Sequence, residues 1–434
     1  MTARRRRRSS AERFGVVTDR IVIVGGGLAA ATAATELRKR GFDGSIRLLA
    51  GEPHPPYIRP PLSKGYLTGS EELSAAFVHP DEWYGEHDVQ LSTSARVERV
   101  DRAASTVILS DGEAVRYDRL LLATGAEPRR LSIPGSDARG IHYLRTVENS
   151  EELRAELAAG SKRIAIVGAG WIGLEIAAAA RGYGNDVVVI GRERVPLEGP
   201  LGVELGAVFQ RLHESHGVRF ELGTATSGFR VDEGRVTGVQ LANPNAGDGG
   251  AGAQPRTVDA DLVVVGIGAI PSTELAAAAG LTIDNGIRVD AALRTSDDRI
   301  FAAGDVANAW HPVLGAYLRN EHWATAKAGG KVAAASLMGE SAQLDAIPYF
   351  YTDQFELGME YSGYGPLARG ADVVYRGDPA ALDFIAFWVA DGHVVAGMNV
   401  NVWDVNDQVQ QLIGSRRTVD PARLADPSIA LAEV

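Results

Sequence analysis

The feature that most constrains this chain is a construction that occurs twice: a short β-branched strand, a glycine-rich turn and the beginning of a helix. It spans 21–36 and again 163–180. A strand that enters a helix through a glycine turn predicts a βαβ unit, in which free N–H groups at the helix N-terminus bind a pyrophosphate. Two intact copies in one chain therefore predict two bound dinucleotides.

Each copy follows the G-x-G-x-x-G/A motif, and each motif position has a physical task. The first glycine allows the tight turn, the second lets the backbone approach the phosphates, and the third small residue lets the helix pack closely on its strand. The motif residues are Gly25, Gly27 and Ala30 in the first copy and Gly168, Gly170 and Gly173 in the second. The second strand of the first unit ends near Ala50, which makes Glu52 the candidate carboxylate for the ribose hydroxyls.

Composition narrows the class of protein. The chain has no cysteine, which excludes disulfides, zinc and iron–sulfur sites with cysteine ligands, and any thiol nucleophile. The net charge of −11 disfavours general binding to nucleic acid or anionic membranes, and no apolar run reaches the roughly 18 residues of a membrane span. Arg4–Arg8 is not followed by an apolar segment, so we expect 1–18 to be a disordered basic tail on a cytoplasmic enzyme.

A third segment makes a family resemblance specific. Two prolines fix the backbone of the sequence R-P-P-L-S-K over 59–64. This segment, downstream of the first glycine motif, resembles the FAD-dependent ferredoxin reductases of multicomponent oxygenase systems. Further segments resemble the same family, in the same order, along nearly the whole chain from residue 20. They are 120–125, 143–146, 263–271 and 300–305.

The resemblance implies an α/β fold of the glutathione-reductase type, with two Rossmann-like dinucleotide-binding domains and a C-terminal α+β domain. The FAD-binding domain is expected over 19–128 and 259–340, and the segment 263–268 is expected to return the chain to it. The NAD(P)-binding domain is expected over 129–258 and an interface domain over 341–434.

Local patterns add detail to two regions. Short segments rich in aromatic residues predict an antiparallel sheet near the C-terminus. They are 349–358, 371–375, 384–389 and 393–402. The composition of 244–255, dominated by Asn, Pro, Gly, Ala and Asp, is typical of an inserted loop.

A flavin accepts a hydride as an electron pair and can release the electrons singly. Because the chain has no cysteine pair to receive them, reduction of disulfides through an enzyme thiol is excluded. The resemblance favours transfer to an iron–sulfur ferredoxin, [2Fe-2S] or similar, that feeds an oxygenase, with the reductase a monomer or homodimer. Two alternatives stay open: reduction of a small acceptor such as a quinone or monodehydroascorbate, and a redox-sensing role similar to that of apoptosis-inducing factor.

The same resemblance places Lys64 and Glu175 beside the isoalloxazine ring, close enough to pair, as the candidate catalytic residues. A lysine there would stabilise negative charge on the reduced flavin, and Glu175 would face the nicotinamide. The alternatives are a surface lysine and a solvated glutamate in the first turn of a helix. His213 and His216 have no metal-ligand spacing and are expected to be solvated, so no metal site is predicted.

The remaining candidates follow from the residue-by-residue match. Besides the first motif and Glu52, the residues expected at FAD are Ala29, Arg59, Lys64, Val97, Thr124, Gly125, Arg145, Gly304, Asp305 and Trp323. Besides the second motif and Glu175, those expected at NAD(P) are Ile172, Arg192, Arg194 and Gly268.

The second unit departs from the pattern at its strand end. A carboxylate there would select NADH, but the strand over 187–190 is followed by Gly191-Arg192-Glu193-Arg194. The two arginines suit the additional phosphate of NADPH, while Glu193 could turn inward to suit NADH. Both cofactors therefore stay open at this point.

Overall fold

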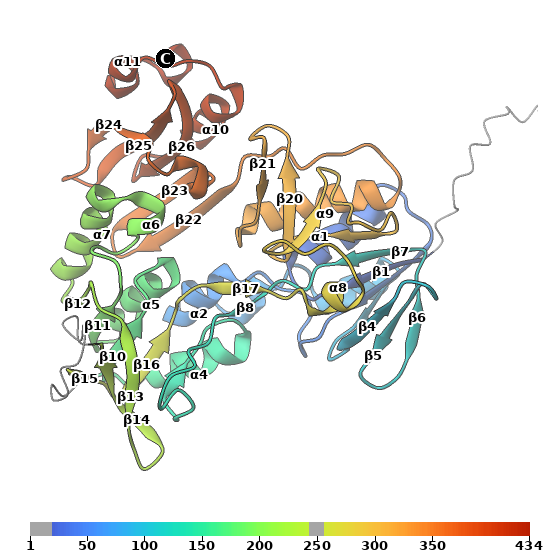
Figure 1. The fold of residues 1–434 in the computed structure, drawn as a ribbon, viewed down its shortest axis with the longest axis horizontal. Coiled ribbons are helices and arrows are strands. Elements are labelled where there is room, and N and C mark those ends of the chain that lie inside the picture. The colour runs from blue at the N-terminus through green and yellow to red at the C-terminus, as the bar shows by residue number, and fades with distance from the viewer. Residues whose placement is uncertain (1–19, 243–255) are drawn as a thin grey trace, which may run out of the picture.

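The computed structural model describes residues 20–242 and 256–434 (Figure 1). The predicted tail over 1–18 and the predicted loop over 244–255 lie outside the described residues. Three units are visible: one coloured blue and orange, one mainly green, and one red at the C-terminal end. Across the described ranges, no helix has the length and apolar character needed to cross a membrane.

The first unit is built on a five-stranded parallel sheet. In spatial order its strands are β19 (Ile300–Ala302), β7 (Arg119–Leu122), β1 (Arg20–Val24), β2 (Ser45–Leu49) and β3 (Val89–Ser92). Two helices rich in small residues, α1 (Leu28–Lys39) and α9 (Trp323–Leu337), pack against each other beside this sheet. A Cβ at Gly330 would come within 2.7 Å of the Ala29 carbonyl oxygen, so glycine permits this close approach.

The second unit repeats the arrangement. Its parallel sheet has the order β12 (Val218–Glu221), β11 (Asp186–Ile190), β10 (Arg163–Val167), β16 (Leu262–Val265) and β9 (Ile141–His142). Its longer helices are α4 (Val147–Ala158), α5 (Trp171–Gly182) and α7 (Val203–Ser215). Each glycine motif thus lies between a strand of a parallel sheet and the helix that follows it, as the sequence predicted.

The chain returns to the first unit later than we expected. Leu262–Val265 pairs with β10 in the middle of the second sheet, so the expectation that 263–268 belongs to the first unit is wrong for its first three residues. All four residues of this strand are buried, because Leu262 and Val264 pack in one hydrophobic cluster and Val263 and Val265 in another. The two crossings between the units are instead β8 (Ala126–Pro128) and β17 (Ala269–Pro271), which form an antiparallel ribbon in the middle of Figure 1.

The C-terminal unit is an antiparallel sheet, as predicted, but it contains an additional hairpin. Its order is β22 (Tyr349–Gln354), β23 (Leu357–Gly363), β26 (His393–Val400), β25 (Asp383–Ala390) and β24 (Asp372–Asp378). The single segment expected over 349–358 is β22 and the start of β23. The turn between them contains Phe355 at a φ of 55°, and this bulky residue gives no turn signal of the kind that glycine or asparagine would.

Three smaller sheets and several short helices complete the fold. The sheets are β4–β5–β6 (Val97–Asp101, Thr106–Leu109, Ala114–Arg116), β13–β14–β15 (Thr226–Asp232, Arg235–Leu241, Thr257–Asp259) and β18–β20–β21 (Ile287–Val289, Ala307–His311, Ala316–Leu318). The short α-helices are α2 (Gly65–Thr68), α3 (Asp81–Glu86), α6 (Glu198–Leu201) and α8 (Glu274–Ala278), and two further helices, α10 (Asn406–Ser415) and α11 (Pro421–Ala425), follow the C-terminal sheet. Single 3₁₀ turns occur at Pro60–Ser63, Leu73–Ala76, Gly365–Ala368 and Leu431–Glu433.

Candidate active site

A cavity of about 1580 Å³ lies where the three units meet. It is larger than the roughly 300–1,000 Å³ of ordinary small-molecule sites, so it has room for more than one ligand. Its walls include the first glycine turn, the start of α5 and the start of β22. The predicted site residues that line it are Gly25, Gly27, Ala29, Glu52, Arg59, Lys64, Val97, Thr124, Gly125, Arg145, Gly170, Ile172, Glu175, Gly268, Gly304, Asp305 and Trp323.

The first glycine turn leaves a free space at the end of β1. Gly25 has a φ of 132°, and a Cβ there would overlap the carbonyl oxygen of Ala123. At Gly27, by contrast, a Cβ would meet no protein atom within 4 Å. Ala30 is completely buried behind the turn, where the helix packs on the sheet. The three motif positions therefore have the separate tasks that the sequence predicted: turn, open space and close packing.

The three motif positions of the second glycine turn have the same separate tasks. Gly168 has a φ of 115°, and a Cβ there would overlap the carbonyl oxygen of Gly266, while the corresponding position at Gly170 is open. A Cβ at Gly173 would overlap the Gly168 carbonyl oxygen, so α5 lies closer to its turn than α1 does to the first. Gly168 and Gly173 shape the turn from behind and do not line the cavity.

Glu52 lies just beyond β2, on the cavity wall. Its carboxylate accepts a hydrogen bond of 2.8 Å from Arg59 Nη2 and another from the Tyr57 hydroxyl. Arg59 also donates to the carbonyl oxygen of Arg145, and burial raises the pKa of Tyr57, which keeps its hydroxyl protonated as a donor. The 3₁₀ turn that starts at Pro60 fixes the backbone directly after Arg59.

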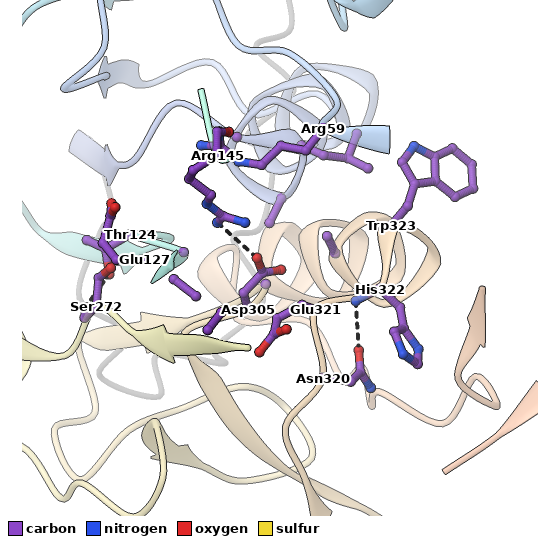
Figure 2. Close-up of a pocket in the computed structure, with 18 of the residues that line it drawn as sticks. Arg59, Thr124, Glu127, Arg145, Ser272, Asp305, Asn320, Glu321, His322 and Trp323 are labelled. Atoms are coloured by element: carbon purple, nitrogen blue, oxygen red, sulfur yellow. Dashed lines mark hydrogen bonds and ion pairs between the residues drawn. The ribbon is translucent and has the colours of Figure 1, made fainter. Parts of the chain in front are cut away.

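An ion pair crosses the floor of the cavity. Arg145 Nη2 lies 3.0 Å from Asp305 Oδ2, and both side chains are 16% exposed (Figure 2). Burial and the nearby charge of Arg59 lower the pKa of Arg145. Asp305 follows β19 and Gly304, in the place where the sequence pattern put a carboxylate. The pair therefore joins the segment between β9 and α4 to the end of the first sheet.

Several polar atoms on the cavity wall are buried and have no hydrogen-bond partner in the described chain. They include Arg145 Nε, Ser272 Oγ and His322 Nδ1. Buried polar groups are nearly always satisfied in native proteins, so these atoms favour a polar ligand. Ser272, Asn320 and His322 were not among the predicted residues; Figure 2 shows Ser272 next to Thr124, and Asn320 beside His322. Nothing in their sequence surroundings marks them.

Lys64 and Glu175 form a buried ion pair. Lys64 Nζ lies 2.6 Å from Glu175 Oε1, with 17% of the lysine side chain and 3% of the glutamate side chain exposed. The alternative of a solvated first-turn glutamate is therefore wrong. Two hydroxyl groups complete the shell: Ser63 Oγ donates to Oε2 over 2.5 Å and Thr352 Oγ1 donates to Oε1 over 2.6 Å. Glu175, on α5 of the second unit, thus receives donors from the first unit and from the C-terminal unit, so the cluster joins all three.

The two hydroxyls were not predicted. Ser63 is part of the R-P-P-L-S-K segment, where only the basic residues stood out. Thr352 lies in β22, whose buried residues alternate, and Thr352 and Gln354 occupy the buried positions. Polar residues on the inward face of a strand are a usable signal, because a buried polar side chain requires a partner.

The family assignment now follows. The model of the family described as pyridine nucleotide-disulphide oxidoreductase matches 19–330, and a second model, described as reductase C-terminal, matches 349–434. The chain belongs to the pyridine nucleotide-disulphide oxidoreductase family. This oxidoreductase is 39% identical to the ferredoxin–NAD(+) reductase component of an anthranilate 1,2-dioxygenase system from Burkholderia cepacia, over 93% of its own chain and 96% of the relative.

Two further comparisons point the same way. Putidaredoxin reductase from Pseudomonas putida is 36% identical, with 96% of each chain covered. The crystal structure of the covalent putidaredoxin reductase–putidaredoxin complex contains a chain that matches with a TM-score of 0.89 at 35% identity, over 96% of this chain and 97% of that one. The predicted fold and family resemblance are therefore confirmed, and the chain is an FAD-dependent NAD(P)H oxidoreductase.

The shape and the polar groups of the cavity in this oxidoreductase fit FAD. The open position at Gly27 gives room for a pyrophosphate, and a polar ligand would supply the hydrogen-bond partners that Arg145 Nε and Ser272 Oγ lack among the described residues. Trp323 begins α9 on the cavity wall, with Lys327 Nζ 4.7 Å from its ring centre. Within 20–242 and 256–434 no group of three or more His, Cys, Asp or Glu residues could hold a metal ion.

A hydrogen-bonded chain continues from Glu175 into the interior of the oxidoreductase. Gln354 Nε2 lies 3.2 Å from Thr352 Oγ1, and Gln354 Oε1 lies 2.8 Å from His213 Nε2 on α7. His213 has no exposed surface, so the expectation that it is solvated is wrong. Burial lowers its pKa to about 4. His216, one helical turn on, stacks on the Phe355 ring at 3.9 Å and is partly exposed.

The buried position of His213 predicts an acid-sensitive contribution to stability. Its pKa is lower in the folded chain than the 6.5 of the unfolded chain, so the unfolded chain takes up the proton first. Stability is therefore lost as the pH falls from about 6.5 towards 4. Between pH 7 and pH 5 we expect His213 to account for about 2 kcal/mol of the loss.

The measurement is the thermal unfolding of the FAD-loaded protein at pH 7 and pH 5, compared with His213→Gln. Glutamine keeps a donor for Gln354 but does not titrate in this range. The difference in midpoint between the two pH values should be several degrees smaller in the variant. Equal differences in the two proteins would contradict the prediction.

The arginines after β11 have separate environments. Arg194 donates to Glu198 through Nε over 2.9 Å and through Nη2 over 2.5 Å, and its own side chain is 74% exposed. Arg192 is exposed as well. Neither arginine lines the cavity, whereas the predicted NAD(P) residues Gly170, Ile172, Glu175 and Gly268 do.

Proposed function

We propose that this oxidoreductase passes electrons from NAD(P)H through FAD, one at a time, to an iron–sulfur ferredoxin that feeds an oxygenase. The observation that carries the proposal is one cavity lined by both glycine turns in a chain without cysteine. Many flavoproteins pass electrons on to a disulfide, but this chain has no thiol for that step. Full-length relatives named for ferredoxin support a one-electron protein acceptor.

In this proposal the first unit binds FAD. The first glycine turn would bind its pyrophosphate, and the Glu52 carboxylate would bind its ribose. Asp305 and Arg145 would contact the central part of the FAD molecule. The remainder of the site is lined by Val97, Thr124, Gly125, Gly304 and Trp323. FAD supplies the chemistry, because it accepts an electron pair and releases single electrons. Arg59 already pairs with Glu52 and holds its carboxylate in place, so the ribose hydroxyls would bind an acceptor that they share with Arg59.

The second unit presents NAD(P)H to the same cavity. Gly170, Ile172 and Gly268 lie on its wall, and Glu175 faces it from the first turns of α5. Lys64 supplies a positive charge that is held by Glu175 and largely shielded from water. Such a charge favours the reduced, more negative state of the nearby cofactor without any proton transfer.

The experiment is anaerobic stopped-flow reduction of the FAD-loaded protein by NADH and by NADPH, followed by mixing with a [2Fe-2S] ferredoxin encoded near this gene. We expect the flavin to be bleached by at least one nicotinamide nucleotide. The flavin should then be reoxidised rapidly as two ferredoxins are reduced for each nucleotide consumed. A control without ferredoxin should keep the flavin reduced. Fast turnover with a quinone in place of ferredoxin, and slow transfer to ferredoxin, would contradict the proposal.

A further inference from the structure

The nucleotide site of the second unit lacks the acidic residue that such units use for selectivity. In βαβ units a carboxylate about 20 residues after the glycine motif binds the 2′-hydroxyl of the adenosine ribose. In this chain β11 ends at Ile190 and the next residue is Gly191. The ribose therefore requires another acceptor if NADH is to be selected.

The structure places a different carboxylate beside that position. A Cβ built on Gly191 would lie 2.8 Å from Glu193 Oε2, and 3.1 Å from the Cβ of Ala169 in the second glycine turn. Glu193 thus folds back across Gly191, into the volume where a side chain at the end of β11 would begin. Only a glycine at 191 leaves this volume free for the carboxylate.

The backbone around Glu193 is held by the neighbouring segment 221–224. Gly191 N donates to the carbonyl oxygen of Glu221 over 3.0 Å, and Gly223 N donates to the carbonyl oxygen of Glu193 over 2.9 Å. A third bond of 3.0 Å joins Thr224 N to the Gly191 carbonyl oxygen. These bonds hold the three-residue segment that positions the carboxylate, so its location does not depend on a free loop.

The neighbouring cations are less well placed for a 2′-phosphate. Arg194 is engaged by both carboxylate oxygens of Glu198, through its side chain and through its backbone N over 2.7 Å. Arg192 is exposed and forms no ion pair with any described residue. Glu193 is exposed as well, so screening by water does not separate the two charges. Their positions do, because the Glu193 carboxylate already lies beside the end of β11.

We propose that Glu193 replaces the missing carboxylate at the end of β11 and makes this site select NADH over NADPH. The inference rests on the proposed function only in that the second unit binds a nicotinamide nucleotide. The carboxylate accepts hydrogen bonds from the ribose hydroxyls of NADH, and it repels the doubly charged 2′-phosphate of NADPH.

The test is the dissociation constants of NAD⁺ and NADP⁺ for the FAD-loaded full chain, measured by calorimetry. The wild type should bind NAD⁺ at least tenfold more tightly than NADP⁺. Glu193→Gln removes only the charge and should reduce this ratio by about tenfold or more. Asp186→Asn removes the same charge from the other end of β11 and should leave the ratio unchanged. Arg192→Ala should change it by less than about twofold.

A restoring variant makes the test specific. Gly191→Glu combined with Glu193→Gln returns a carboxylate to the usual place; its Cβ displaces the flexible end of residue 193 and requires small shifts of Ala169 and Leu222, whose nearest atoms lie at 3.1 and 3.2 Å. It should recover the preference for NAD⁺. An unchanged ratio in Glu193→Gln, or a wild-type preference for NADP⁺ that Arg192→Ala removes, would overturn this inference alone. Binding of neither nucleotide by any form would overturn both this inference and the proposed function.

Discussion

Replacing Gly25 with alanine is expected to abolish FAD binding and to destabilise the fold by about 3–5 kcal/mol. The new Cβ would overlap a backbone oxygen, that of Ala123 at the end of β7, and would impose a φ of 132° on a residue that avoids it. β7 lies between β19 and β1 in the parallel sheet, so it cannot move aside. The measurements are FAD content after purification and the thermal unfolding midpoint.

Gly27→Ala is the matched control for this variant. Its Cβ would meet no protein atom within 4 Å, and the residue lines the cavity. We expect a folded protein whose unfolding midpoint without FAD is within a few degrees of the wild type, but which retains little FAD because the methyl group occupies phosphate space. Similar FAD loss with similar unfolding in both variants would contradict the division of tasks between the two glycines.

The second large effect is expected from Glu175→Ala. The substitution removes the common acceptor of three hydrogen bonds, donated by Lys64, Ser63 and Thr352, in a nearly closed site. Breaking a buried ion pair typically costs about 3–5 kcal/mol, and we expect a loss near the lower limit because Lys64 is 17% exposed. Flavin reduction by the preferred nucleotide should slow by about 100-fold, since the lysine is no longer held in place.

Two further variants separate charge from structure. Glu175→Gln keeps an acceptor for the hydroxyls and should lose less stability than alanine. Lys64→Met should make the flavin potential more negative, because the positive charge beside the cofactor is removed. The double variant Lys64→Met/Glu175→Gln should be more stable than the sum of its single changes predicts, since the two residues are in direct contact. Additive effects on stability and an unchanged potential would contradict the assigned roles.

The sequence alone determined those features that depend on neighbouring residues. A β-branched strand, a turn that requires glycine and a small residue for helix packing all lie within ten positions, so both dinucleotide units could be located. The first glycine of each motif has the positive φ that this turn requires. The absence of cysteine likewise needed no structure to exclude thiol chemistry. The resemblance then added Lys64 and Glu175, which the fold brings into contact.

Only the tertiary structure decided the features that join distant segments. Thr352 and Glu175 are 177 positions apart, and no local pattern connects them. His213 is buried because the C-terminal sheet covers the apolar face of α7, and its partner Gln354 lies 141 positions away. The apolar sequence of the strand Leu262–Val265 would suit either parallel sheet, and only its pairing with β10 shows that it belongs to the second. Glu193 reaches the end of β11 because Gly191 leaves space, which depends on the three-dimensional path of the backbone.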